Sequence, residues 1–134
     1  MKSTLATTID VINILNSGAV RGNAELMEAI AQDVSYLAKI LREKEVTKNI
    51  ALIEREYVEL DEEGKIVLSV QEGKKRSTLK EGANGEEMRG KISEFLGTEV
   101  EFEDGSFKVN YELLKGATAS ILTPQQYAIL RKIY

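Results

Sequence analysis

The stretch GEEMRGKI, residues 85–92, matches the motif of a nucleotide-binding phosphate loop at every defined position except the last. The full motif, G-x-x-x-x-G-K-[ST], surrounds phosphates with backbone amides and places a hydroxyl on Mg²⁺. Ile92 stands where the hydroxyl belongs, and Glu86 and Glu87 would repel a phosphate inside the loop. We therefore predict no nucleotide site here, but an ordinary helix that Asn84 caps.

The apolar spacing downstream of Asn84 supports that helix. Met88, Ile92 and Leu96 recur at helical intervals, and Gly97 stands where a C-terminal glycine belongs. Gly90 inside the helix costs about 1 kcal/mol relative to alanine. Close packing against another element would account for it.

A second near match is ELDEEGKIVLSV, residues 59–70, where acidic residues recur as in a calcium-binding EF-hand loop. The twelfth position of that loop supplies a bidentate glutamate, but Val70 stands there. Glu59 and Glu63 occupy positions where the shorter aspartate or asparagine is usual. We predict a solvated turn at residues 61–65 and no metal site.

The composition excludes most catalytic chemistry. The 134 residues include no cysteine and no histidine, which removes thiol nucleophiles, disulfides, imidazole bases and the usual zinc ligands. Carboxylates such as Glu99, Glu101 and Glu103 remain, but their alternate spacing is typical of a solvated sheet face. Catalysis by two carboxylates requires both in one pocket. We predict no catalytic residue, no cofactor and no enzyme activity.

The only basic cluster lies in KKRSTLK, within the polar, glycine-rich stretch 71–85 that we predict to be a loop. Such cations can contact nucleic-acid phosphates, although no aromatic residue interleaves them for base stacking. The net charge of −4 disfavours a broad nucleic-acid surface, and a solubilising loop is the alternative interpretation. The candidate contact residues are Lys74, Lys75, Arg76 and Lys80.

The longest helical pattern covers about residues 23–60, without glycine or proline. A continuous helix of this length would extend about 55 Å. Its apolar residues follow steps of three and four, except for a step of five between Leu41 and Val46. The helix therefore bends or breaks there, or its halves pack on different partners. The residues available to a partner helix, here called the partner-helix stripe, are Leu37, Leu41, Val46, Ile50, Ile53 and Tyr57.

A β-hairpin is predicted over residues 98–111, because Asp104-Gly105 suits a two-residue type I′ turn. The register gives a continuous apolar face and one favourable charge pair. Its facing residues are Phe102 with Phe107, Val100 with Val109, and Glu101 with Lys108.

Short helices are predicted at both ends of the sequence. Thr7 or Thr8 caps the first, and the last begins with Thr123 at the N-cap, Pro124 at the first helical position and Gln126 completing a capping box.

One further strand is predicted at residues 65–70, with Ile66, Leu68 and Val70 on one face. Together these elements predict a single α+β domain over residues 1–134, in which a long helix and short terminal helices pack with a small antiparallel sheet. No apolar run approaches the ~20 residues that span a bilayer, and the N-terminus lacks the apolar core of a signal peptide. We expect no membrane contact.

Several motifs occur together in a fixed order: IDVINILN, LREKEVTKNIALIEREYVEL, DEEGK, EEMRGKISEFLGTEVEF and ILTPQQYAIL. In this order and spacing, the chain resembles a family of small proteins of unknown function in tailed bacteriophages and prophages of Gram-positive hosts. The resemblance covers most of the chain, apart from SGAVRGN and GKKRSTLKEGANG. It implies a phage context, in the host cytoplasm or the virion, and carries over no catalytic residue.

Two functions follow as hypotheses. The first is a non-enzymatic phage-derived protein, a virion structural or assembly component that acts through protein contacts. A helix of about 55 Å exceeds what a compact domain with a radius of gyration of ~14 Å can cover, so its stripe requires a partner, most simply another copy or another phage protein. The alternative is a small regulatory or host-interaction protein that binds nucleic acid through the basic loop 74–80.

Overall fold

A computed structural model describes residues 1–119 and 121–134, except for the side chain of Gln71. The chain forms two compact units, one comprising Met1–Lys44 with Leu96–Tyr134 (unit 1) and the other Glu45–Phe95 (unit 2). Each unit is described by itself below. The single domain expected over residues 1–134 stays a prediction.

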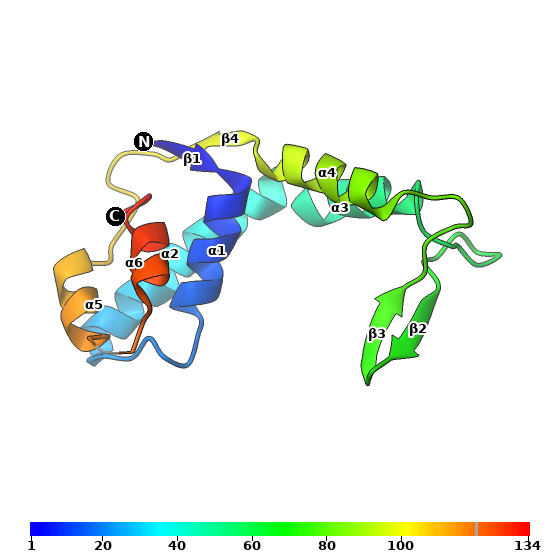
Figure 1. Ribbon diagram of the computed structural model, residues 1–134. Coiled ribbons are helices and arrows are strands. Elements are labelled where there is room, and N and C mark those ends of the chain that lie inside the picture. Colours follow the sequence, from blue (N-terminus) through cyan, green and yellow to red (C-terminus); the bar gives the residue numbers. More distant parts are fainter. Residues whose placement is uncertain (120) are drawn as a thin grey trace. The chain divides into compact units, whose positions relative to one another are not determined.

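Helices and small antiparallel sheets make up both units (Figure 1). This confirms the predicted α+β class. Unit 1 contains β1 (Lys2–Thr4), α1 (Leu5–Leu15), α2 (Ala24–Glu43), β4 (Glu99–Glu101), α5 (Tyr111–Ala117) and α6 (Pro124–Leu130). Unit 2 contains α3 (Val46–Arg55), β2 (Leu68–Gln71), β3 (Lys74–Ser77) and nearly all of α4 (Gly85–Leu96).

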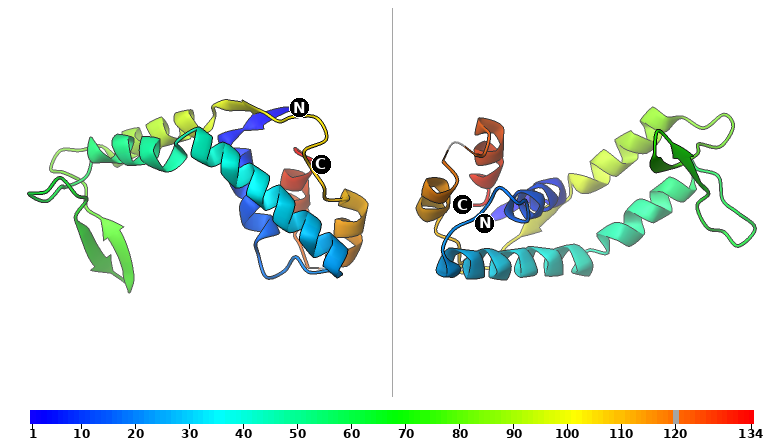
Figure 2. Two further views of the ribbon diagram at one scale, coloured as in Figure 1. Left: turned by 180° about the vertical axis from the view of Figure 1, so that it is seen from behind. Right: turned by 90° about the horizontal axis from the view of Figure 1, so that it is seen from below.

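The helical pattern at residues 23–60 is two helices, which Figure 2 shows as separate coils. The first ends at Glu43 and the second begins at Val46. Between them Glu45 has a φ of 49°, a left-handed conformation that is uncommon for a residue other than glycine. The step of five between Leu41 and Val46 therefore marks a break and not a bend.

Helix α1 is the centre of unit 1, where it packs against α2 and α6. Thr4 caps it, and its Oγ1 accepts a hydrogen bond from the amide of Thr7 at 3.2 Å. The predicted caps Thr7 and Thr8 are wrong, since both are buried within the helix. The helix begins earlier because β1 leads directly into it. Buried apolar side chains in this unit include Leu5, Val11, Leu15, Leu26, Ile30, Leu37, Leu114, Leu130 and Ile133.

The N-terminal strand β1 takes the position that the predicted hairpin assigned to residues 107–110. It pairs antiparallel with β4, and Lys2 lies opposite Glu101 and Thr4 opposite Glu99. The amide of Phe102 continues the pairing by donating to the carbonyl of Met1 at 2.8 Å. The hairpin predicted at 98–111, with its Glu101–Lys108 pair, is therefore wrong.

A buried carboxylate accounts for the missing ladder. Asp33 on α2 is 0% exposed, and it accepts hydrogen bonds from the amides of Lys108 at 2.7 Å and Val109 at 3.0 Å. These amides bind the aspartate and not a neighbouring strand. The phenol of Tyr134 donates a third bond to Asp33 at 2.7 Å. Three segments that are distant in sequence thus meet at one side chain.

The turn at Asp104-Gly105 also differs from the prediction. A type I′ turn requires a positive φ at both central residues. Gly105 has a φ of 75°, but Asp104 is not among the residues with positive φ, and the amide of Ser106 donates to the carbonyl of Glu103. Phe102 and Phe107 nevertheless contact each other, with ring centroids 5.2 Å apart. The predicted aromatic contact therefore exists without strand pairing.

Asn substitution of Asp33 tests how much the carboxylate contributes to stability. An asparagine keeps one acceptor oxygen and turns an NH₂ group toward a buried donor, so we expect Asp33→Asn to lower the free energy of unfolding by about 2–4 kcal/mol. Urea denaturation followed by circular dichroism measures the change. The exposed Asp10→Asn is the matched control, with an expected change within about 0.5 kcal/mol. Equal stability of the two variants would contradict this account.

The Tyr134 phenol makes stability depend on alkaline pH. Burial, followed by the hydrogen bond to Asp33, raises the pKa of Tyr134 above its usual range near 10.0. The folded protein keeps this proton above pH 10, whereas the unfolded chain loses it. The stability that Tyr134 contributes is therefore present below pH 10 and declines as the pH rises.

Tyr134→Phe should lower stability by about 1–3 kcal/mol at pH 7, because one charge-assisted hydrogen bond is lost. The difference from the wild type should narrow above pH 10, by up to about 1.4 kcal/mol per pH unit. Urea unfolding from pH 7 to 11 measures both values. A difference that stays constant over this range would show that the phenol ionises freely in the fold.

Candidate functional site

The near match to a phosphate loop is a helix, as predicted. Helix α4 begins at Gly85, and the Oδ1 of Asn84 accepts the amides of Glu86 at 3.0 Å and Glu87 at 3.2 Å. Two of the amides that would surround a phosphate are therefore already occupied by the cap. The lysine of the near match, Lys91, also interacts with side chains of unit 2.

The ammonium of Lys91 lies 3.3 Å from the Glu56 carboxylate, on the segment that follows α3. It also lies over the Tyr57 ring, 5.2 Å from its centroid. The Tyr57 side chain and then the Glu56 carboxylate raise the pKa of Lys91 to about 12. Lys91 therefore connects α4 to the end of α3 within unit 2, and a packing role explains it without a nucleotide.

Among the described residues, no atom packs closely against the glycine inside α4. A Cβ built on Gly90 meets none of their heavy atoms within 4 Å, so the close packing suggested for it is wrong. At Gly85 the same Cβ would lie 3.1 Å from the Leu79 Cδ1. Of these two glycines in one helix, only Gly85 is in close contact.

Gly90→Ala should therefore stabilise the protein by about 0.5–1 kcal/mol, because alanine loses less backbone entropy in a helix. Thermal unfolding should show a higher midpoint. Gly85→Ala is the matched control and should give no such gain, since its methyl group would crowd Leu79. A destabilised Gly90→Ala would mean that an unseen contact occupies that side of α4.

The acidic turn after α3 binds its own backbone. Asp61 Oδ1 accepts the amides of Glu63 and Lys65, each at 2.9 Å. This arrangement explains the turn predicted at residues 61–65 as an Asx-type turn.

The partner-helix stripe is not one surface. Leu37 is 0% exposed and lies inside the core of unit 1. Val46 and Tyr57 are also buried, while Leu41, Ile50 and Ile53 are half-buried. Because the helix breaks at residues 44–45, the stripe is also interrupted. The interruption agrees with the change of phase predicted between Leu41 and Val46. Whether any residue of the stripe contacts a partner stays a prediction.

Lys74, Lys75 and Arg76 lie on a β-hairpin and not on a loop, which corrects the prediction for residues 71–79, whereas residues 80–84 form no helix or strand, as predicted. Strand β3 pairs antiparallel with β2, with Ser69 opposite Arg76 and Val70 opposite Lys75. The connecting Glu72 and Gly73 have φ values of 53° and 77°, both positive as a type I′ turn requires. The turn type predicted at Asp104-Gly105 occurs here.

The hairpin strands continue beyond β2 and β3, and the segment 57–61 lies between their ends. On one side, the amide of Lys80 donates to the carbonyl of Tyr57 at 2.8 Å. On the other side, the amide of Val67 donates to the carbonyl of Glu59 at 2.9 Å. We call residues 65–80 the arm.

One face of the arm and its adjoining segment is mainly apolar, with Lys75 and Ser77 as its polar members. Paired residues and alternate residues share a face of a sheet, and the observed pairs assign one set of residues to this side. We call it the apolar face. Its members are Val58, Leu60, Ile66, Leu68, Val70, Lys75, Ser77 and Leu79.

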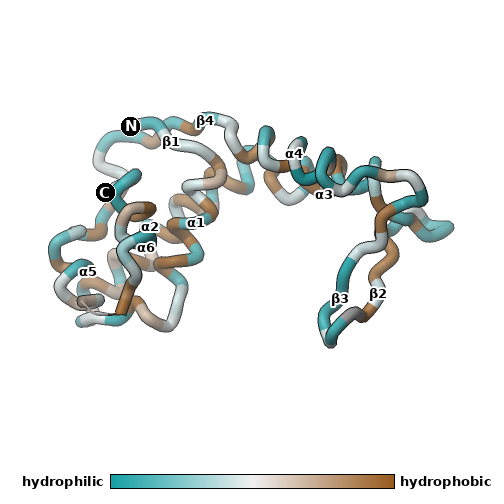
Figure 3. Tube along the Cα trace, in the orientation of Figure 1, coloured by the Kyte–Doolittle hydropathy of each residue, from teal (hydrophilic) through white to brown (hydrophobic). Residues whose placement is uncertain are grey.

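The distal part of the apolar face is open to solvent. Leu68 is 58% exposed and Val70 is 71% exposed, whereas Val58 at the other end is fully buried. Figure 3 shows hydrophobic colour along β2 and hydrophilic colour along β3. By alternation, Lys65, Lys74, Arg76 and Lys80 share the opposite face, here called the basic face.

The arm is the basic part of an acidic protein. It holds five of the 18 basic residues and, at Glu72, one of the 22 acidic residues. Lys65 pairs with Glu63 at 3.4 Å, and Lys80 donates to the carbonyl of Arg55. Lys74, Lys75 and Arg76 form no ion pair with the described residues. Their charges are therefore available to an outside partner.

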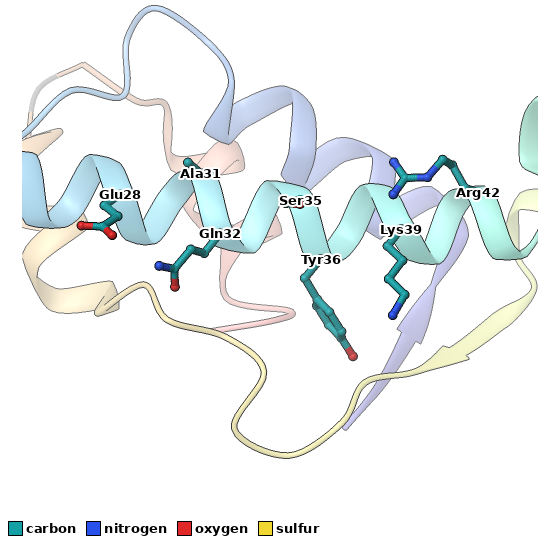
Figure 4. Close-up of a pocket in the computed structure, with 7 residues that line it drawn as sticks. All are labelled: Glu28, Ala31, Gln32, Ser35, Tyr36, Lys39 and Arg42. Atoms are coloured by element: carbon teal, nitrogen blue, oxygen red, sulfur yellow. The ribbon is translucent and has the colours of Figure 1, made fainter.

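A shallow depression of about 550 Å³ runs along α2 in unit 1 (Figure 4). Its polar lining mixes acidic, amide and basic side chains, among them Glu28, Gln32 and Lys39. Tyr36, which also lines the depression, has a structural role. Its hydroxyl accepts a hydrogen bond from the amide of Glu103 at 3.0 Å, and its ring contacts Phe107. This is a weaker candidate than the arm, because no charge or apolar patch is concentrated in it.

No protein-family model, curated protein or solved structure matches this chain significantly. In the described residues no helix combines the length and the apolarity needed to cross a membrane. The arm is therefore identified as the candidate interaction site from its geometry and charge alone. The sequence predicted four of its five cations as candidate contacts and placed Ile66, Leu68 and Val70 on one face, but it did not predict strand β3, which joins the two features in one hairpin.

Proposed function

We propose that this chain is a non-enzymatic protein that works through protein contacts, and that the arm makes them. The observation that carries this proposal is the exposure of Leu68 and Val70 on the apolar face. A two-stranded hairpin is marginally stable alone in water, so a partner that covers these side chains would stabilise the arm. Cover by another protein accounts for apolar residues that would otherwise remain in solvent.

The chain's chemistry supports a binding role over catalysis. It has no cysteine or histidine, and Lys91 is held by Glu56 and Tyr57. Exposed side chains at Glu99 and Glu101 fit a solvated sheet face. These observations favour a protein that binds over one that catalyses a reaction.

The order of the five sequence motifs supports a phage origin. On that basis the proposed role is a structural or assembly component of a tailed phage, present in the host cytoplasm and/or the virion. Its partners are other phage proteins or further copies of itself.

A second candidate function is nucleic-acid binding, which Lys74, Lys75 and Arg76 favour because none of them forms an ion pair in the described part of the chain. Such binding would weaken steeply with salt, as contacts to phosphates do. The net charge of −4 and the absence of aromatic residues from the arm weigh against it. It also leaves the apolar face unexplained.

Leu68→Lys tests the protein-contact proposal in a phage that encodes this chain. Burying a lysine in place of a leucine should weaken the contact by about tenfold or more. The chain should then be lost from sedimented particles or assembly intermediates, and the yield of infectious phage should fall. Leu113→Lys on α5 is the matched control, because Leu113 is 56% exposed in unit 1.

Unfolding measurements should show that both variants remain as stable as the wild type, since both leucines are largely exposed. Normal yield and normal sedimentation of Leu68→Lys would refute the role of the arm. Salt-dependent DNA or RNA binding that is lost when Lys74, Lys75 and Arg76 become alanine would favour the second function.

A further inference from the structure

Opposite charges lie at the tip of the arm and at the turn that precedes it. The tip bears Lys74, Lys75 and Arg76 beside the Glu72-Gly73 turn, and the preceding turn, residues 61–64, bears Asp61, Glu62 and Glu63, of which Glu63 pairs with Lys65. Residues 65–71 connect the two turns, a distance of about 20 Å in extended conformation. Along this length, the apolar face lies between a basic end and an acidic end.

The proximal part of the apolar face is partly covered within the chain, with Leu60 36% and Leu79 40% exposed. Val58 is fully buried, and Leu79 contacts the first turn of α4, where a Cβ on Gly85 would lie 3.1 Å from its Cδ1. The open part centres on Leu68 and Val70, which are on one strand and two positions apart. A partner therefore needs an apolar surface of similar size, with an acidic group at the position of the arm's tip.

We propose that the partner is a second copy of this chain, whose arm packs antiparallel and face to face on the first around a two-fold axis near Leu68. This inference rests on the protein-contact function proposed above. The axis places Val70 of one copy over Ile66 of the other and, at each end, a basic tip over an acidic turn. The apolar face meets an identical face, as an isologous contact requires.

Charge selects the antiparallel arrangement. A parallel stack would place the lysines of one tip on those of the other, and the acidic turns on each other. The two-fold stack instead brings Lys75, the basic residue on the apolar face, toward Glu62 of the second copy, and does so twice. It also leaves the basic face pointing outward, so that like charges on the two arms stay apart.

Reciprocal charge reversal tests this geometry. Lys75→Glu alone turns two attractions into repulsions, and so does Glu62→Lys alone, so each variant should dimerise about tenfold or more weakly than the wild type. An equal mixture of the two variants should recover the dimer. In the mixed pair, the two substituted positions face each other with opposite charges at one end, and the native Glu62 and Lys75 face each other at the opposite end.

Sedimentation velocity over a dilution series, with one variant fluorescently labelled, measures the dissociation constant of each dimer. Glu25→Lys and Lys115→Glu, both exposed in unit 1, are charge-matched controls and should dimerise as the wild type does. Leu68→Lys should abolish the dimer. Circular dichroism checks that every variant keeps its fold.

A wild-type chain that is monomeric at every concentration would overturn the proposal, and so would a mixture that fails to recover the dimer. A monomer whose Leu68→Lys variant still lowers phage yield would retain the protein-contact function with a different partner. A monomer whose nucleic-acid binding is lost in Lys75→Glu and kept in Glu62→Lys would assign the arm to nucleic acid and overturn the self-association.

Discussion

Unit 1 depends on one buried carboxylate. Asp33 accepts the amides of Lys108 and Val109 and the phenol of Tyr134, so a single side chain on α2 fixes both the segment before α5 and the end that follows α6. An ionised group without partners would be very costly in this place, and three donors offset that cost. The same bonds turn residues 108–109 away from strand pairing. The sheet of unit 1 is then completed by β1, and α1 enters the core directly from it.

Local signals made several elements predictable. The capping box at Thr123 and Gln126 is present, and Asn84 caps α4 as its spacing predicted. Asp33 was not predictable, because its partners lie 75, 76 and 101 positions away and no local pattern marks them. The hairpin at 98–111 failed for the same reason, since its register satisfied local rules while the amides it required were taken by a distant residue.

The arm shows how a strand can be defined by its neighbour. The alternation of Ile66, Leu68 and Val70 predicted one strand and its shared face correctly. Strand β3 was missed because the sequence KKRS has no apolar residue at all, and it is a strand because β2 and the Glu72-Gly73 turn hold it in register. The cations recognised from sequence thus lie on a sheet, and alternation divides them between its two sides.

The Glu72-Gly73 turn adds a conformational free-energy cost to the folded arm. A glutamate at a φ of 53° adopts a conformation that costs roughly 1–2 kcal/mol for a residue with a Cβ, in a hairpin already near its limit of stability. The hydrogen bonds from Lys80 and Val67 to segment 57–61 offset part of this cost within the chain. A contact that covered Leu68 and Val70 would offset more of it.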